Sequence, residues 1–339
     1  MNRAIILMLL LAGCGAPVGR RQGVVVLREA PDVALAPVPG PAYMAKTSRL
    51  MLFRPRSVRA THDTLFICDS GNDRVRVVDG DLDEVVTFGR TGSGPGELKN
   101  PPDMRLHHGM VGVLDNVNRR VNVYDDDGTY RYDFVLPGSA VSFGFLGTGR
   151  IVVPDETGGH AFAVIDSSGG VLRLGRRAPA APGVRPAYPN ARERMRGRGI
   201  DQVAVMGDTV AVADNVTGVI ALYSADGTML AAMALPLDLL QAVFDRLREV
   251  DKGFGGRNLY SDVYHDLSVE ADGRLLLPVG LPDVAVVIVD PSNRTVARVM
   301  APAGSTGAGA RSAVSIARIG RRFIFAGYNG ISIYRTAAR

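Results

Sequence analysis

The stretch "LFICDSGNDRVRVVDGDLDEVVTF", residues 65–88, decides the fold because the chain repeats its pattern directly afterwards. The stretch "VGVLDNVNRRVNVYDDDGTYRYDF", residues 111–134, has the same order of apolar run, polar turn, apolar run, second turn and final strand. The two copies align with a constant offset of 46 residues. Self-similarity at such a period is typical of repeat architectures in which each copy forms one structural unit.

The two copies share a set of polar residues around the first turn. The set consists of Asp69, Asn72 and Arg74 in the first copy and of Asp115, Asn118 and Arg120 in the second. Aspartate and asparagine side chains bond the backbone of their own turn, and an arginine can brace a neighbouring turn or unit. Because the set recurs with the period of the repeat, we expect a structural role rather than twin active sites.

Weaker copies begin at residues 151, 210, 274 and 322, which makes six in all. Each copy consists of strands separated by turn residues, and no long helices alternate with the strands. This pattern excludes a parallel α/β sheet. A repeat of roughly 40–50 residues that carries four strands is typical of a propeller blade. The sequence therefore predicts an all-β, six-bladed β-propeller over residues 23–339.

The segment "CDSGNDRVRVVDGDLDEVVTFGRTGSGPGELKNPPDM", residues 68–104, resembles the NHL-repeat family, and more closely the bacterial lipoproteins built as six-bladed NHL-like propellers. The first two copies carry this resemblance, and the other four match only in their strand pattern. In that family the glycine-rich segment links the outer strand of one blade to the inner strand of the next. We expect the same role here rather than phosphate binding, because Glu97 and Leu98 separate Gly96 from Lys99 and two prolines follow.

The beginning of the chain, "MNRAIILMLLLAGCGAP", has a short basic start, an apolar run and small residues before Cys14. It resembles the lipobox of bacterial lipoproteins, and the alternative is an ordinary secretory signal with an incidental cysteine. The resemblance implies a signal peptide at residues 1–13, a diacylglyceryl group on Cys14 and a tether at residues 14–22. It also implies a cell-envelope location, at the outer membrane facing the periplasm. The other cysteine, Cys68, lies in an apolar strand, where a buried inert thiol is expected.

The last repeat offers three strands, so a fourth must come from elsewhere. The segment Gly23–Ala30, "GVVVLREA", is apolar and β-branched at its start and is expected to supply the outer strand that closes the ring. One segment breaks the β pattern with apolar residues at helical spacing, which predicts a helical insertion at about residues 237–251. Asp238 is the expected N-cap and Gly253 is expected to lie beyond its end. This helix either caps one face of the ring or binds a partner.

The chain has a formal net charge of +5, and its excess of basic residues is almost entirely arginine. Many of these arginines lie in one stretch between Arg173 and Arg198. Nucleic acid is a poor partner for an exported protein, so we expect this stretch to be a solvated connection or to contact an anionic surface.

Carboxylates precede three of the strands that are expected to line the central channel: Asp103, Asp201 and Asp266. Three carboxylates that converge on one axis could bind calcium, which prefers several oxygen ligands, and His107, His265 and Asn215 lie near in sequence. In the alternative, each aspartate bonds a loop amide or pairs with an arginine such as Arg56 or Arg59.

These observations predict a lipid-anchored envelope propeller that binds a protein or small-molecule partner, with no cofactor and no catalytic residues. The propeller resemblance also implies an alternative, because related six-bladed propellers include calcium-dependent lactonases and lyases. In that case Asp103, Asp201 and Asp266 would hold the metal and His107 or His265 would be the general base. A third hypothesis is an assembly factor that uses the helix or the arginine-rich connection. The fold does not decide among them.

Overall fold

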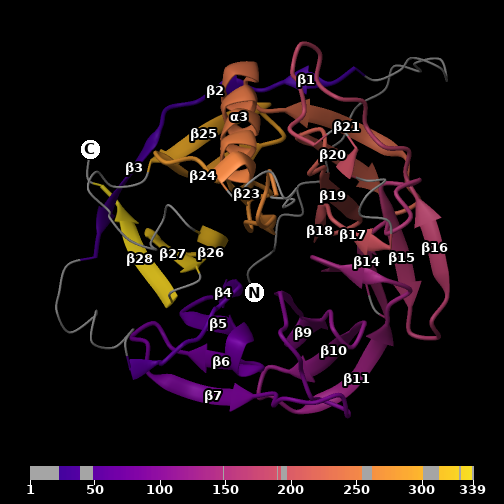
Figure 1. Ribbon diagram of the computed structural model, residues 1–339. Helices are drawn as coiled ribbons and strands as arrows, with labels where there is room; N and C mark the ends of the chain where they lie inside the picture. The colour runs from indigo at the N-terminus through magenta and orange to yellow at the C-terminus, as the bar shows by residue number, and fades with distance from the viewer. Residues whose placement is uncertain are drawn as a thin grey trace, which may run out of the picture.

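The computed structural model of the protein shows a ring of β-sheets arranged like the blades of a propeller around a central channel (Figure 1). It describes residues 23–38, 49–147, 149–188, 190–191, 197–253, 262–300, 313–327 and 330–337. The expected signal peptide, Cys14 and the tether lie outside the described residues. Strands are the dominant regular structure of the described chain, and the prediction of a β-propeller is confirmed.

Three sheets each contain four strands that follow one another along the chain from the channel to the rim. Their strands are β4 (Ser57–Thr61), β5 (Thr64–Asp69), β6 (Arg74–Val78) and β7 (Glu84–Phe88); β8 (Asp103–His107), β9 (Met110–Asp115), β10 (Arg120–Asp125) and β11 (Tyr130–Val135); and β13 (Gly144–Phe145), β14 (Arg150–Pro154), β15 (Phe162–Asp166) and β16 (Val171–Leu174). A short 3-10 helix, η1 (Ser70–Asn72), forms the turn between β5 and β6.

A five-stranded sheet continues the ring, and it consists of β18 (Gln202–Met206), β19 (Thr209–Ala213), β20 (Val219–Ser224), β21 (Met229–Ala234) and, at the rim, β1 (Val25–Val26). The short strands β12 (Ser139–Ala140) and β17 (Arg198–Gly199) pair with each other in parallel. A nine-stranded sheet completes the ring in two runs: β22 (Ser268–Val269), β23 (Leu275–Pro278), β24 (Val284–Asp290) and β25 (Thr295–Met300), then β26 (Ala313–Ile319), β27 (Arg322–Gly327) and β28 (Gly330–Thr336). The two runs are joined through β3 (Val33–Pro37), and β2 (Arg28–Glu29) pairs with β25.

The ring is closed by an N-terminal strand, but the prediction that Gly23–Ala30 supplies it is wrong. Within that segment β1 pairs with β21 of the five-stranded sheet and β2 pairs with β25, in the first run of the nine-stranded sheet. The outer partner of β28 is β3, which pairs with it antiparallel through Leu35, Ala36 and Pro37. The N-terminal segment therefore runs along the rim past β21, β25 and β28 (Figure 1). The apolar start of Gly23–Ala30 marked a strand correctly, but the two-residue pairings of β1 and β2 end before they reach the last run.

The middle strands are continuous apolar runs because neighbouring sheets cover both of their faces. β9 is buried along its length apart from its first residue, and β24 is buried apart from its last. The hydrophobic clusters lie between sheets: Leu114 and Val121 pack with Ile151 and Ile165 of the next sheet. The outer strands, such as β7 and β16, are more exposed. The side-chain packing between sheets therefore holds the ring together without long helices.

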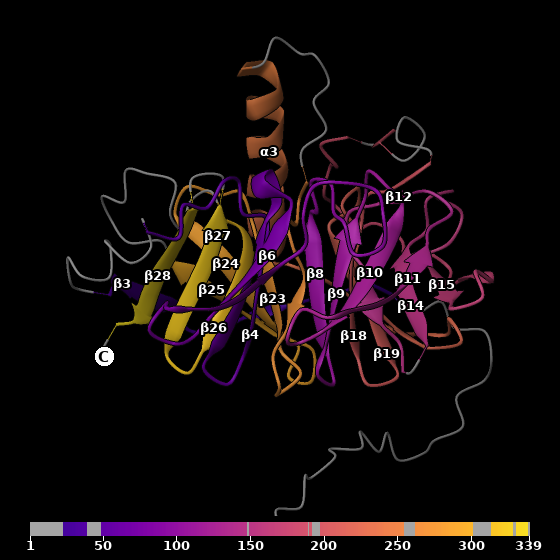
Figure 2. The same ribbon diagram turned by 90° about the horizontal axis from the view of Figure 1, so that it is seen from below.

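The helical insertion, α3 (Leu237–Gly253), rises from one face of the ring (Figure 2). Its apolar stripe is buried against the core, with Leu240 and Phe244 fully covered. The helix therefore caps this face, as one of the two sequence hypotheses expected. Asp238 lies in its first turn rather than at the N-cap, and the N–H of Leu240 bonds the carbonyl of Pro236. Gly253 is the last helical residue rather than the first beyond it. No helix in the described ranges is long and apolar enough to cross a membrane.

Candidate functional site

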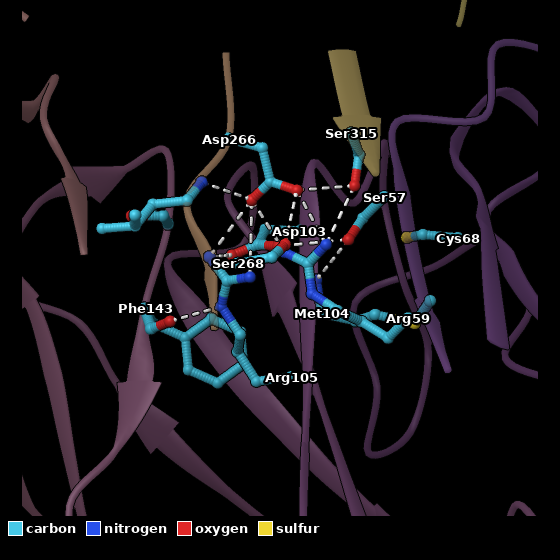
Figure 3. A network of polar contacts seen from close by, with 12 residues as sticks. Ser57, Arg59, Cys68, Asp103, Met104, Arg105, Phe143, Asp266, Ser268 and Ser315 are labelled. Carbon is cyan, nitrogen blue, oxygen red and sulfur yellow. Dashed lines mark hydrogen bonds and ion pairs between the residues drawn. The ribbon is translucent and has the colours of Figure 1, made fainter. Parts of the chain in front are cut away.

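The innermost strands place alternate side chains in the central channel, because side chains in a strand alternate between its two faces. In β4 the residues Ser57 and Arg59 share one face, and in β8 Asp103 and Arg105 share one face. The 46-residue offset makes these two pairs equivalent. Figure 3 shows how they meet Asp266, which precedes β22, and Ser315 of β26.

Two arginines and two aspartates form a buried network in the channel (Figure 3). Arg59 donates from Nη1 to Asp266 Oδ2 and from Nη2 to Asp103 Oδ1, both at 2.8 Å. Arg105 Nη2 lies 3.0 Å from Asp103 Oδ2, and its Nη1 lies 3.4 Å from Asp266 Oδ1. None of the four side chains belongs to a residue more than 8 % exposed. Each carboxylate is therefore shared by two guanidinium groups.

Neutral groups complete the network. The Ser315 hydroxyl donates to Asp266 Oδ2 at 2.7 Å, and the Ser57 hydroxyl donates to Asp103 Oδ1 at 3.1 Å. The N–H of Leu267 bonds Asp266 Oδ1 at 2.8 Å, and Arg105 Nε bonds the carbonyl of Phe143 at 2.8 Å. Buried charges are tolerated when they are paired and hydrogen-bonded in this way. The network therefore links the inner strands of neighbouring sheets to one another.

The protonation of this network follows from burial and pairing. Burial raises the pKa of the Asp103 carboxyl, against the opposing effect of Arg59. Burial alone would lower the pKa of Arg59, but Asp266 and Asp103 outweigh it and hold that pKa above its usual value. Arg59 therefore stays charged, and its charge is matched within the network. Two guanidinium groups facing two carboxylates leave no net charge when both aspartates are ionised.

The third predicted carboxylate does not share these arginines. Asp201 Oδ2 lies 2.7 Å from Arg177 Nη1, and Asp201 Oδ1 accepts the backbone N–H of Asn215 at 2.9 Å. The structure thus brings Asp103 and Asp266 together and gives Asp201 a different arginine. No group of three or more histidine, cysteine, aspartate or glutamate side chains in the described residues could hold a metal ion. The donor set does not fit calcium, because guanidinium groups occupy the oxygens that a cation would need, and we derive no metal-dependent step from it.

The two histidines proposed as alternative bases lie in different surroundings. His107, at the end of β8, stacks on the ring of Phe145 with centroids 5.1 Å apart. Burial, together with the neighbouring His108, lowers the pKa of His107. Burial lowers the pKa of His265 to about 4. Both imidazoles are therefore neutral at neutral pH, and a catalytic role for either one stays a prediction.

On the side of the network away from the strand starts, the channel widens into a cavity of about 580 Å³. Arg59 and Arg105 lie at its inner end, and His107 lies toward its mouth. The rest of the mouth is formed by the turn between β22 and β23 and by Arg318 and Gly320 next to the turn between β26 and β27. Since α3 joins the outer end of β21 to the start of β22, this cavity faces away from the helix.

The repeated polar residues hold the connections between sheets. Asp69 Oδ2 accepts Asn72 Nδ2 at 2.8 Å and Arg74 Nε at 2.9 Å, and its Oδ1 accepts the N–H of Phe53 at 2.7 Å. The second copy repeats the arrangement. Asp115 accepts Asn118 Nδ2 at 2.7 Å, Arg120 Nε at 3.2 Å and the N–H of Lys99 at 3.2 Å. In both copies the aspartate fastens the segment that enters an inner strand.

The glycine-rich loop is fastened from the second sheet. Asn118 Nδ2 bonds the carbonyl of Gly92 at 2.9 Å, and Arg120 Nη2 bonds the carbonyl of Gly94 at 2.7 Å. The Glu97 carboxylate accepts the N–H of Gly94 at 2.7 Å. A carboxylate of the chain itself therefore takes the backbone donor that a phosphate would need. Gly96 has a φ of +70°, in the left-handed region that favours glycine, and a Cβ there would lie 3.1 Å from Tyr130 Cβ.

Cys68 is fully buried, and its thiol lies 3.3 Å from the carbonyl of Pro101. Burial raises the pKa of Cys68 to about 12, so the thiol stays protonated. The expectation of a buried inert thiol is confirmed.

Three residues of these ion-pair networks were not predicted from the sequence: Arg105, Arg177 and Ser315. A signal for Arg105 existed, because the offset that aligns Asp69 with Asp115 also aligns Arg59 with Arg105. Arg177 was visible only as part of the arginine-rich stretch. In the structure Arg177 pairs with Asp201, and Arg173 pairs with Asp155 and Glu156, so part of that stretch is bound within the protein. Nothing in the sequence marks Ser315.

Comparison with known proteins supports the fold and nothing finer. No protein-family model matches the chain, and no curated protein matches it in sequence. A gluconolactonase from Xanthomonas campestris is similar in structure with a TM-score of 0.52, 13 % identity, and coverage of 94 % of this chain and 99 % of that one. A putative exported protein from Bacteroides fragilis has a TM-score of 0.52 and 14 % identity, with coverage of 93 % of this chain and 100 % of that one. A protein of unknown function from Bacteroides thetaiotaomicron has a TM-score of 0.53 and 11 % identity, with coverage of 93 % of this chain and 75 % of that one.

Proposed function

We propose that this protein is a lipid-anchored binding or scaffold propeller of the cell envelope rather than an enzyme. The observation that carries the proposal is the network of Arg59, Arg105, Asp103 and Asp266. A catalytic channel keeps acids, bases or a metal available to a substrate, whereas these four charged side chains pair with one another and are buried. The similarity to a gluconolactonase concerns the fold, and a fold does not determine its chemistry.

The proposal includes the finer architecture expected from the sequence. We count six blades by treating the nine-stranded sheet as two blades that share β3, since each run begins with an inner strand of its own. The NHL-like character rests on the Asp–Asn–Arg set and on the glycine-rich connection that it fastens. The membrane attachment rests on Cys14 and on the apolar run before it, with the outer membrane facing the periplasm as the proposed site.

A protein partner is supported by exposed apolar side chains on the face that carries α3. Met51 is 73 % exposed, Phe53 is 55 % exposed and Val117 is 54 % exposed. Met51 and Phe53 precede β4, and Val117 lies in the turn between β9 and β10, so all three lie where inner strands begin. Exposed apolar groups that gather on one face are typical of interaction sites. Nucleic acid is not proposed as a partner.

The first experiment separates binding from catalysis. The purified protein is analysed for bound calcium, its thermal unfolding is followed with and without chelator, and a panel of lactones and esters is offered as substrates. The proposal expects no stoichiometric calcium, no change in Tm with chelator and no turnover. Stoichiometric calcium with hydrolysis that is lost in Asp266→Asn would refute it and would establish the calcium-dependent enzyme.

The second experiment tests the partner and the anchor. A photo-crosslinking residue is placed at position 53 and, as a matched control, at position 172, because Leu172 is 60 % exposed but lies on the outer strand β16. The proposal expects a discrete cross-linked envelope protein from position 53 and none from position 172. Mass spectrometry of the mature N-terminus should show an acylated Cys14. An unmodified Cys14 in the mature protein would remove the anchor from the proposal.

A further inference from the structure

The cavity on the hairpin side of the channel exists because the inner strands carry small residues there. Its walls include Ala60, Gly144, Ala204 and Ala317, alongside larger apolar side chains. Its volume of about 580 Å³ is in the range of sites that bind metabolite-sized molecules, roughly 300–1,000 Å³. It faces away from α3 and from the apolar side chains proposed to meet a protein partner. A ligand in this cavity would therefore leave that face free.

Arginines and carboxylates line the cavity in pairs, except at its inner end. Arg274 and Arg318 pair with the lining carboxylates Asp272 and Glu270, whereas Arg59 and Arg105 line the inner end without a carboxylate beside them in the lining. Asp103 and Asp266 balance the two inner arginines, but they are not among the lining residues. An entering molecule therefore meets guanidinium groups first at the inner end. Such a surface favours an anionic or electron-rich group.

The inner end also holds a donor that the protein does not use. Arg59 is 8 % exposed and bonds through Nη1 and Nη2, whereas its Nε is buried without a hydrogen-bond partner among the described residues. A buried donor without a partner costs free energy unless an acceptor reaches it.

Two aromatic side chains, His107 and Phe145, line the cavity. The rings of His107 and Phe145 are stacked, with an angle of 17° between their planes. Because burial lowers the pKa of His107, the imidazole is neutral at neutral pH and its stack with Phe145 presents an uncharged surface. Such a surface suits a flat aromatic body. Arg318 stands at the mouth from β26 and pairs with Glu270 at 2.9 Å.

We propose that this cavity binds a small organic acid with a flat aromatic body, whose acidic group meets the arginines and whose ring lies along His107 and Phe145. The inference rests on the proposed binding function and gives it a second ligand site. An organic anion is favoured over a cation because Arg59 and Arg105 line the inner end of the cavity, whereas their partners Asp103 and Asp266 do not. An aromatic body is favoured over a branched aliphatic one because the rings of His107 and Phe145 both belong to the lining.

The test uses 2-naphthoate as the probe and isothermal titration of the purified protein as the measurement. The neutral 2-naphthamide has the same ring and lacks the charge, so it isolates the contribution of the arginines. The proposal expects one site for 2-naphthoate and at least tenfold weaker binding of the amide. Absence of 2-naphthoate binding, or equal binding of the amide, would overturn it.

Two pairs of variants locate the site. His107→Ala should weaken 2-naphthoate binding at least tenfold, whereas His108→Asn, which changes the adjacent exposed histidine outside the lining, should not. Arg318→Gln should weaken it by a similar factor, whereas Arg321→Gln, three residues further on and outside the lining, should not. All four positions are at least partly exposed, so folding should survive, and circular dichroism checks it. Binding that is unchanged in both lining variants would overturn the proposal.

The two proposals fail in distinguishable ways. Conversion of 2-naphthoate esters or of lactones by the protein would overturn the non-catalytic function, whatever the probe binds. Absence of probe binding without any turnover would overturn the cavity proposal alone.

Discussion

Replacing Arg59 with methionine should be among the most destabilising single changes in the channel. The two terminal nitrogens of Arg59 lie within hydrogen-bond distance of five acceptor atoms: the carbonyl of Val58, the Ser315 hydroxyl, one oxygen of Asp103 and both oxygens of Asp266. Methionine fills much of the same volume but removes the charge and all of these N–H donors. The two carboxylates would then share Arg105 alone, and one negative charge would remain buried without a partner.

The size of the effect follows from that uncompensated charge. Breaking a buried ion pair by removing one partner costs about 3–5 kcal/mol. For a domain of this size about 2 °C is lost per kcal/mol, so the Tm should fall by about 6–10 °C. The cost should shrink as the pH falls, because burial raises the pKa of Asp103 and its protonation removes the unpaired charge. The loss of unfolding free energy in Arg59→Met should therefore be larger at pH 8 than at pH 5.

The assay is urea unfolding at several pH values, with a double variant as the decisive arm. Adding Asp266→Asn to Arg59→Met leaves Asp103 facing Arg105 at 3.0 Å and restores the balance of charge. The double variant should regain about 2 kcal/mol relative to Arg59→Met. Arg90→Met serves as the control, because Arg90 pairs with Glu97 while its side chain is 81 % exposed. If Arg59→Met costs no more than this control, or if the second change adds to the loss, the reasoning about the network is wrong.

Three further outcomes are expected. Because burial raises the pKa of Asp103, the folded protein holds that proton more tightly than the unfolded chain; stability should fall as the pH rises from the ordinary aspartate range toward neutrality, and Asp103→Asn should flatten this slope in urea titrations. Cys68 should resist a thiol reagent in the native protein and react in urea, with peptide mass spectrometry assigning the label; rapid labelling of Cys68 in the native state would contradict its burial. Gly89→Ala and Gly109→Ala should each lower the free energy of unfolding by roughly 1–2 kcal/mol, because both glycines have positive φ. Gly89→Ala should lower it further, because its Cβ would lie 2.5 Å from Leu98 Cδ1. Equal losses in urea unfolding would contradict the crowding at Gly89.

Local pattern was sufficient to predict the propeller. The 46-residue offset, the apolar runs and the turn residues are all written within single repeats, so the strands from β4 to β11 follow from residues 57–135. The closing strand was harder to predict, because β3 directly follows Gly23–Ala30 in the N-terminal segment. "GVVVLREA" is more β-branched than β3, but β3 is the strand that lies beside β28 on the rim.

The network in the channel was predicted only in part. The aspartates were found because each stands at or before the start of an inner strand, and Arg59 was named as an alternative partner. The sequence could not show that Asp103 and Asp266 share two arginines while Asp201 pairs with Arg177, because that depends on distances across the ring. The cavity was not predicted for the same reason: small residues such as Ala60 and Ala204 leave space only once their strands face each other.

The course of the N-terminal segment sets the order in which the ring would yield to a pull on that end. The first contacts to carry the load are the two-residue pairings of β1 with β21 and of β2 with β25. Each pairing would break separately, because each joins the segment to a different strand. Only then would the load reach β3, which is held on one edge by β25 and on the other by β28. The two short pairings would therefore break first and release slack in the N-terminal segment before force acts on the pairing that closes the ring.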